Sequence, residues 1–194
     1  MKCIPSSQAD LWLRKIGMKL DDWNRIVYIS NDFKASLTQY QAPRDALQLF
    51  CFSRHAVEWL PRGDWWLLQL DNSTPFDPDT ASLFSPLLAS SSGDLDLVEN
   101  RTFVFEFDAG EERDGRLGLQ ISNLVFALLL LRCHAYLVSS KSTEGQMLSL
   151  QDGFVYLATR EQNELKARVL IASYERNPTG SPKWVNEIVA RYQK

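Results

Sequence analysis

The chain has few of the residues that catalytic and metal sites need. Its 194 residues include two histidines, His55 and His134, and three cysteines (Cys3, Cys51, Cys133) without any CxxC spacing. Zinc sites need clustered cysteine and histidine ligands, so this pattern predicts no metal and no cofactor. An odd number of scattered cysteines also predicts reduced thiols in place of disulfides.

Other catalytic and ligand-binding patterns are also missing. Cys133 precedes His134, but adjacent side chains of a strand point to opposite faces and cannot form a nucleophile–base pair. There is no GxxxxGK[ST] loop, and acids occupy the glycine-containing segment 110–118, where a phosphate would have to bind. Lysines and arginines are dispersed, so no basic patch indicates nucleic acid. These absences predict a protein that is no enzyme and has no catalytic residues.

The first residues of the chain contain no apolar signal-peptide core, which predicts a cytoplasmic protein. The longest apolar segment covers residues 117–139, and residues 124–131 are apolar without interruption. A membrane span needs about 20 apolar residues in a row. Arg132 and His134 interrupt the segment before that length, so we predict a buried core helix over about 117–131 and no membrane contact. A transmembrane helix is the second alternative.

The remaining pattern predicts an α+β fold with a mixed or antiparallel sheet, a C-terminal β-meander and a C-terminal helix. Asp152-Gly153 lies between two apolar runs, which is typical of a β-hairpin. We expect one domain over residues 1–194, with a candidate boundary in the loop 88–100. The predicted helices are 8–16 (with Ser6 or Ser7 as its cap), 44–60 and the last one, from Ser181-Pro182 to Tyr192. The predicted strands are 25–30, 64–71, 101–108, 133–138, 147–150, 154–159 and 167–174, and a loop precedes Pro43. Residues 47–52 could instead form a strand.

The charge is distributed unevenly. Residues 64–115 contain twelve acids and two arginines, a net charge of −10, whereas the whole chain carries −3 and the remainder therefore +7. Such a block attracts basic partners, although solvated loops would explain it as well. Trp65 and Trp66 are adjacent, so in a strand one would face the core and leave the other free. The candidate partner-binding residues are Asp71, Asp77, Asp79, Glu106, Asp108, Glu111, Glu112, Asp114, Trp65 and Trp66.

In overall character the chain resembles bacterial immunity proteins, which neutralise toxins such as nuclease effectors. The resemblance rests on the acidic residues 64–115 and on the missing active-site motifs, and it assigns no role to a single position. It implies a binding protein whose acidic surface pairs with a basic cognate toxin. Two alternatives stay open: a small-molecule-binding or enzymatic α+β domain with a pocket between sheet and core helix, and a subunit that forms a homodimer.

Overall fold

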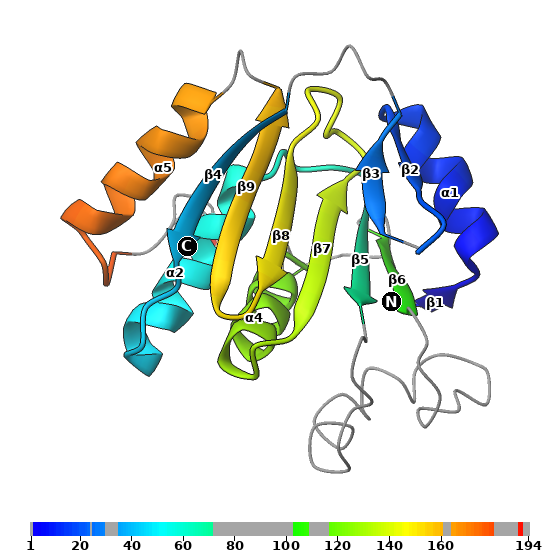
Figure 1. Ribbon diagram of the computed structural model, residues 1–194. Helices are drawn as coiled ribbons and strands as arrows, with labels where there is room; N and C mark the ends of the chain where they lie inside the picture. Colours follow the sequence, from blue (N-terminus) through cyan, green and yellow to red (C-terminus); the bar gives the residue numbers. More distant parts are fainter. Residues whose placement is uncertain are drawn as a thin grey trace.

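A computed structural model describes residues 2–23, 25–29, 35–71, 103–108, 117–160, 164–180 and 190–191. These residues form a seven-stranded sheet with the order β1-β6-β5-β7-β8-β9-β4, and every neighbouring pair is antiparallel (Figure 1). The strands are β1 (Lys2–Ile4), β4 (Ala35–Gln41), β5 (Trp65–Asp71), β6 (Phe103–Asp108), β7 (His134–Ser139), β8 (Met147–Gln151) and β9 (Phe154–Arg160). The predicted α+β class with an antiparallel sheet is confirmed.

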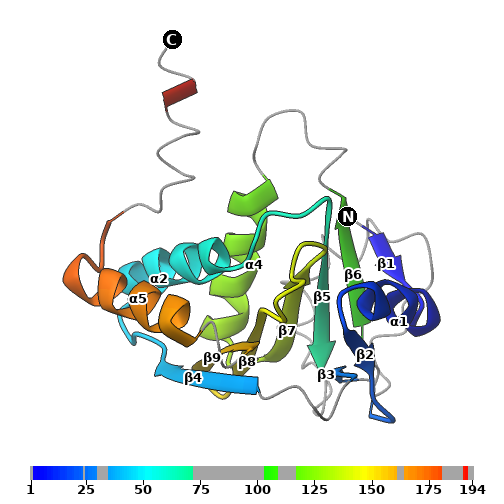
Figure 2. The ribbon, with the colours of Figure 1, turned by 90° about the horizontal axis from the view of Figure 1, so that it is seen from above.

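Three helices cover one face of this sheet: α2 (Ala46–Trp59), α4 (Leu117–Leu130) and α5 (Glu164–Arg176) (Figure 2). The predicted core helix is α4, and its Leu128 and Val125 are fully buried. Leucine and alanine favour helix, and a helix this apolar must be covered on most sides. Phe52 of α2 is also fully buried and stacks on Tyr40 of β4, with 4.9 Å between the ring centroids. This layer holds the larger core of the molecule.

Local capping explains where α2 begins. The Asp45 side chain accepts a hydrogen bond from the Gln48 backbone N–H at 2.9 Å, which satisfies one of the unpaired donors of the first turn. The helix therefore follows Asp45 and excludes Pro43 from its first turn. The alternative strand over residues 47–52 is wrong.

The other face carries a smaller layer made of α1 (Ser6–Lys15) and the two-stranded sheet β2 (Met18–Leu20) and β3 (Ile26–Tyr28). Its buried residues include Leu13 and Met18, which pack with Leu67 of β5. The predicted cap at Ser6 or Ser7 is wrong: Pro5 occupies the N-cap without a side-chain hydrogen bond, and both serines are inside the helix. Proline fits this place because its fixed φ suits the entry to a helix.

The C-terminal half forms the predicted antiparallel meander from β7, β8 and β9. Asp152 and Gly153 connect β8 to β9 with φ of 51° and 82°, the conformation that a two-residue hairpin turn requires. Strands from both sides of the segment 72–102 pair in one sheet, because β5 contacts β6 and β7. The candidate boundary at 88–100 lies outside the described residues.

Two predicted elements differ from the structure. Residues 167–174 belong to α5, and the buried Ala167 and Tyr174 with the half-buried Leu170 and Ile171 follow helical spacing. The predicted loop before Pro43 contains β4, whose residues do not alternate between apolar and polar, because Ser36 and Thr38 lie on the helix-covered side and Leu37 lies on the other. Most of the predicted last helix lies outside the described residues. The two described residues of this segment, Ala190 and Arg191, are helical. No described helix combines the length and the apolarity that crossing a membrane requires.

Candidate functional site

The described candidate acids, Asp71, Glu106 and Asp108, do not lie together. Asp108 is exposed at the end of β6, where it pairs in register with Trp65. Asp71 is at the opposite end of β5, where its backbone pairs with His134. Glu106 is buried, with 5% of its surface exposed, so its carboxylate does not contribute to a surface for a second protein. Asp77, Asp79, Glu111, Glu112 and Asp114 lie outside the described residues.

The tryptophan pair occupies both faces of β5. Trp66 is buried in the core under the helices, as expected for one member of the pair. Trp65 points to the other face, but it is not free: its ring lies 5.2 Å from that of Trp12 in α1. The first helix therefore covers the side chain that the sequence suggested for a partner, because α1 needs an apolar strand to pack on.

A different surface is left uncovered. The layer of α1, β2 and β3 lies over the β1-β6-β5 end of the sheet, and its buried cluster also includes Val138, Met147 and Ala158, one row across β7, β8 and β9. No described helix lies over the rest of β8, β9 and β4 on this face (Figures 1 and 2). Side chains alternate along a strand, so the residues between those of the helix-covered core point to this side. We call this surface the open face; its side chains are Leu37, Gln39, Gln41, His134, Tyr136, Gln151, Phe154 and Tyr156.

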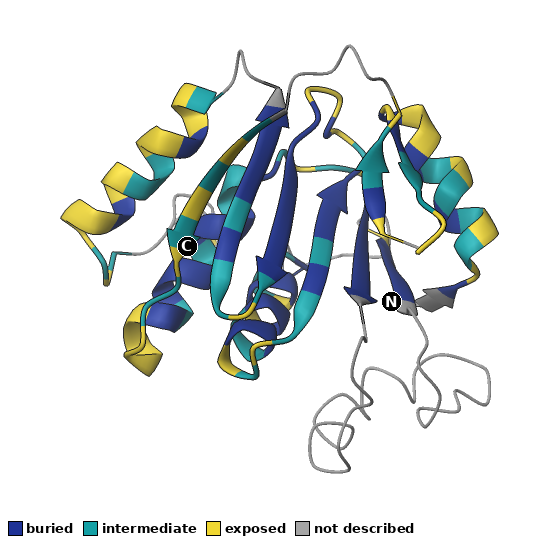
Figure 3. Cartoon of the chain, in the orientation of Figure 1, coloured by how far each residue is buried: buried dark blue, intermediate teal, exposed yellow. Residues whose placement is uncertain are grey.

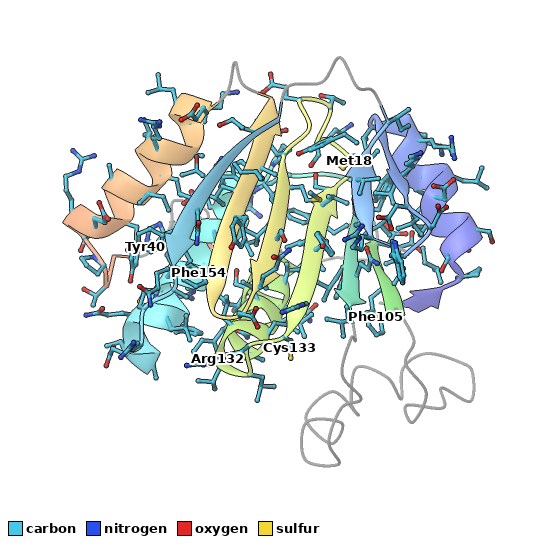
Figure 4. The ribbon with its side chains drawn as sticks, viewed as in Figure 1. Met18, Tyr40, Phe105, Arg132, Cys133 and Phe154 are labelled. Carbon is cyan, nitrogen blue, oxygen red and sulfur yellow. The ribbon has the colours of Figure 1, made fainter. Side chains whose placement is uncertain are left out.

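Pairing between strands orders the open face into rows. Tyr136 and Tyr156 lie opposite Ser149 from its two sides, and Gln39 lies opposite Tyr156 on β4. Ser149 is 5% exposed, so the neighbouring side chains cover it. Gln151, in the next row opposite Phe154, donates its side-chain amide to the Ser149 hydroxyl at 3.3 Å. Figure 3 shows β4 with exposed and half-buried residues and β8 and β9 as mostly buried, and Figure 4 labels Phe154 near the hairpin turn.

The open face contains aromatic rings, amides and one imidazole, and no lysine, arginine, aspartate or glutamate. Charged groups lie around it. His134 Nε2 is 3.1 Å from Asp152 Oδ1 at the hairpin turn, and Lys166 Nζ is 2.9 Å from Glu144 Oε2 near the other end of the strands. An uncharged, aromatic centre with a polar rim is the usual composition of a protein–protein interface.

The metal-ligating side chains and the two histidines of the described residues are dispersed. No group of three or more metal-ligating side chains exists within the described ranges. The Nε2 atom of His55 lies 2.9 Å from the Gly180 carbonyl oxygen, and His134 contacts Asp152. Neither of these two contacts involves a nucleophile.

Comparisons with known proteins provide no family: no protein-family description, curated protein or solved structure matches this chain.

Sequence reasoning missed the open face for a physical reason. Its residues lie on β4, β7, β8 and β9, and β4 is more than a hundred residues before β9 in the chain, so only the sheet order makes them neighbours. The alternation of polar and apolar residues in β8 and β9 indicates strands. It does not show which face a helix will cover.

Proposed function

We propose that this chain is a binding protein without a catalytic site, and that it docks a protein partner on the open face. The observation that supports the proposal is the half-buried array of Tyr156, Phe154 and His134, with Tyr136 beside it at the border of the α1 layer. The array contains no lysine, arginine, aspartate or glutamate, and no described helix lies over Tyr156 and Phe154. Tyrosine offers a large contact area with little loss of side-chain entropy, which makes it frequent at interface hot spots.

We further propose that the partner has a basic surface, in the manner of a toxin bound by a bacterial immunity protein in the cytoplasm. The net charge of −10 in residues 64–115 supports this part. Among the described acids, exposed Asp64 and Asp108 lie at neighbouring positions where β5 begins and β6 ends. Lys141 is 3.2 Å from Asp64, so part of that charge is already compensated within the chain. The acids would therefore accelerate encounter more than they would strengthen the bound state.

Binding to the basic protein encoded next to this chain tests both parts. We expect Tyr156→Ala and Tyr136→Ala to weaken affinity about tenfold or more in titration calorimetry, because buried tyrosines dominate interface energies. Leu11→Ala is the matched control, since Leu11 is exposed on α1, away from the open face. Equal affinities of the tyrosine variants and the control would contradict docking on this face.

The charge is tested separately. Replacing Asp108, Glu111, Glu112 and Asp114 with lysine should slow association at low salt and have little effect at high salt, where surface charges are screened. An unchanged association rate at low salt would remove the acidic residues from the proposal and leave the open face. A binding reaction without salt dependence would also argue against the immunity-protein class.

The alternative pocket between sheet and core helix has no specific support. Side chains of Phe105 and Phe107 on β6 and of Leu124 and Leu128 on α4 fill that layer as parts of one buried cluster. A ligand there would have to displace core residues. A metabolite that raises the melting temperature would revive this alternative.

A further inference from the structure

The two edges of the sheet are protected to different degrees. One edge is β1, which has three residues, begins with Lys2 and is followed by Pro5. Short strands, lysine and proline are the devices that prevent edge-to-edge pairing. The other edge is β4, with seven residues of sequence ASLTQYQ. It contains no charge, no proline and no glycine, so it has none of these devices.

The backbone of β4 offers free hydrogen-bonding groups. The Ala42 N–H donates to the Gly153 carbonyl at 3.0 Å, and these residues continue the β4–β9 register. Hydrogen-bonded pairs alternate along an antiparallel ladder, so Thr38 and Tyr40 are turned toward β9. The N–H and C=O groups of Leu37 and Gln39 therefore point away from the sheet. No described strand lies along that side of β4.

Apolar side chains flank this edge. Leu37 of β4 is 62% exposed, and Leu165 and Val169, one helical turn apart on α5, are 72% and 55% exposed. Helix α5 packs beside β4, and the Ser36 side chain hydrogen-bonds Glu164 at the start of that helix. The edge thus combines unpaired backbone groups with exposed apolar surface on the adjacent helix, as in an interface that lacks its second half.

We propose that β4 pairs with β4 of a second copy of this chain, so that two sheets join across a two-fold axis. The outward backbone N–H and C=O groups belong to Leu37, Gln39 and Gln41. They define a register in which Gln39 lies at the axis and pairs with Gln39 of the second copy, while Leu37 pairs with Gln41. A two-fold interface brings the same surface patch of both copies together. Because β4 is uncharged, this pairing places no like charges opposite each other. This proposal does not depend on the proposed function.

The helices complement each other in the same arrangement. An axis perpendicular to the sheet keeps both α5 helices on one face and makes them antiparallel. Helix α5 has an acid, Glu164, in its first turn and a base, Arg176, in its last turn. The acidic turn of one copy therefore lies toward the basic turn of the other, which is favourable both for the side chains and for the helix dipoles. This self-complementarity favours a second copy over an unrelated strand.

Light scattering after size exclusion tests the proposal with the whole chain. We expect the wild type to have twice the 22.2 kDa chain mass and Gln39→Pro to shift it to the monomer. Proline at position 39 removes an outward N–H and leaves the hydrogen bonds to β9 intact. The dissociation constant of the dimer should therefore rise about tenfold or more. Thr38→Pro is the matched contrast, because it removes an N–H bonded to β9 and should lower the melting temperature instead.

A charge exchange tests whether the partner is the same chain. Gln39→Lys and Gln39→Glu should each be monomeric, whereas their mixture should recover the dimer mass; Leu11→Lys, on α1, should stay dimeric. A monomeric wild type overturns the proposal, and so does a dimer that Gln39→Pro and Gln39→Lys leave intact. If the wild type is a monomer and binds a foreign extended peptide along β4, the edge pairs with another protein. That result would overturn the proposed pairing with a second copy.

Discussion

The two faces of the sheet are covered to different extents, and their composition explains the difference. On one face, β5 to β9 present an almost continuous apolar surface, and α2, α4 and α5 bury it. On the other face the apolar cluster is smaller: Leu67 and Val104 pack under α1, and one further row of Val138, Met147 and Ala158 extends it across β7, β8 and β9. Toward β9 and β4 the same face becomes tyrosine and glutamine. A covering layer forms where enough apolar area is available to stabilise it, and no described helix covers the more polar part of this face.

The largest effect should come from the helix-covered face. Phe52→Ala removes a fully buried ring that stacks on Tyr40 and contacts Tyr174 edge-on. We expect a loss of about 3–5 kcal/mol in the free energy of unfolding, from lost transfer energy and the cavity that stays behind. Chemical denaturation followed by far-UV circular dichroism measures it. A loss below 1 kcal/mol would mean that the helical layer is not the main core.

A smaller effect is expected in the second layer. Leu13→Ala also removes a fully buried side chain, and we expect about 2–3 kcal/mol, since α1 packs on fewer elements. The pair Trp12–Trp65 reports this layer in near-UV circular dichroism. In the variant this signal should decrease at lower denaturant than the far-UV signal. Coincident transitions would show that both layers unfold as one unit.

Acid should also loosen the second layer before the first. Partial burial would raise the pKa of Asp10, but hydrogen bonds from the Leu20 N–H and from Arg14 outweigh it and lower the pKa below 3.8. Hydrogen bonds from Arg25 and from the Trp23 N–H, against the same opposing effect of burial, lower the pKa of Asp21. A carboxylate whose pKa is lower in the folded than in the unfolded state stabilises the fold at pH values above its unfolded-state pKa. This contribution disappears as the pH falls through its folded-state pKa.

Both carboxylates are partly exposed, with 25% and 19% of the side-chain surface accessible, and solvent screens their ion pairs, so we expect a contribution of less than about 1 kcal/mol. The Trp12–Trp65 signal should therefore decline as the pH falls below 3.8. Asp10→Asn should weaken this layer already at neutral pH and reduce its acid response, while Asp22→Asn serves as the control beside Asp21. An acid response unchanged in Asp10→Asn would exclude the Leu20 contact as its cause.

The smallest effect on folding should come from the open face. Tyr156 is half-buried, with Ser149 and Gln39 opposite it, and Tyr156→Ala should change the free energy of unfolding by less than about 1 kcal/mol. The denaturation experiment used for Phe52→Ala measures this as well. A loss as large as that of Phe52→Ala would show that Tyr156 is a core residue, and the open face would then not be a docking surface.

Local sequence was sufficient for several elements. The apolar run 117–131 predicted α4, the Asp152-Gly153 pair predicted the β8–β9 hairpin, and the alternation of residues 101–108 predicted β6. Each of these signals depends on residues a few positions apart. The strand predicted for residues 167–174 was wrong because Val169 and Ile171 favour strands, while the helical spacing of Ala167, Leu170 and Tyr174 matched the surface available beneath α5.

The candidate site was less accessible from sequence. The charge count indicated residues 64–115 as a binding region. It could not show that Glu106 is buried, or that Asp71 and Asp108 lie at opposite ends of the β5–β6 strand pair. The sequence likewise predicted that one tryptophan of the pair is free for a partner, whereas Trp65 packs against Trp12. Burial depends on which distant segment lies above a residue, and no local pattern contains that information.

The sequence by itself determined the class of the fold, the central helix and the hairpin, because propensity and periodicity act within a few residues. Tertiary structure alone decided that β4 would be an unprotected edge, that α1 would cover Trp65, and that Tyr136 and Tyr156 would share an uncovered face. Those outcomes follow from the order in which strands pair and from the limited apolar area that each helix can bury. Both are properties of the whole chain.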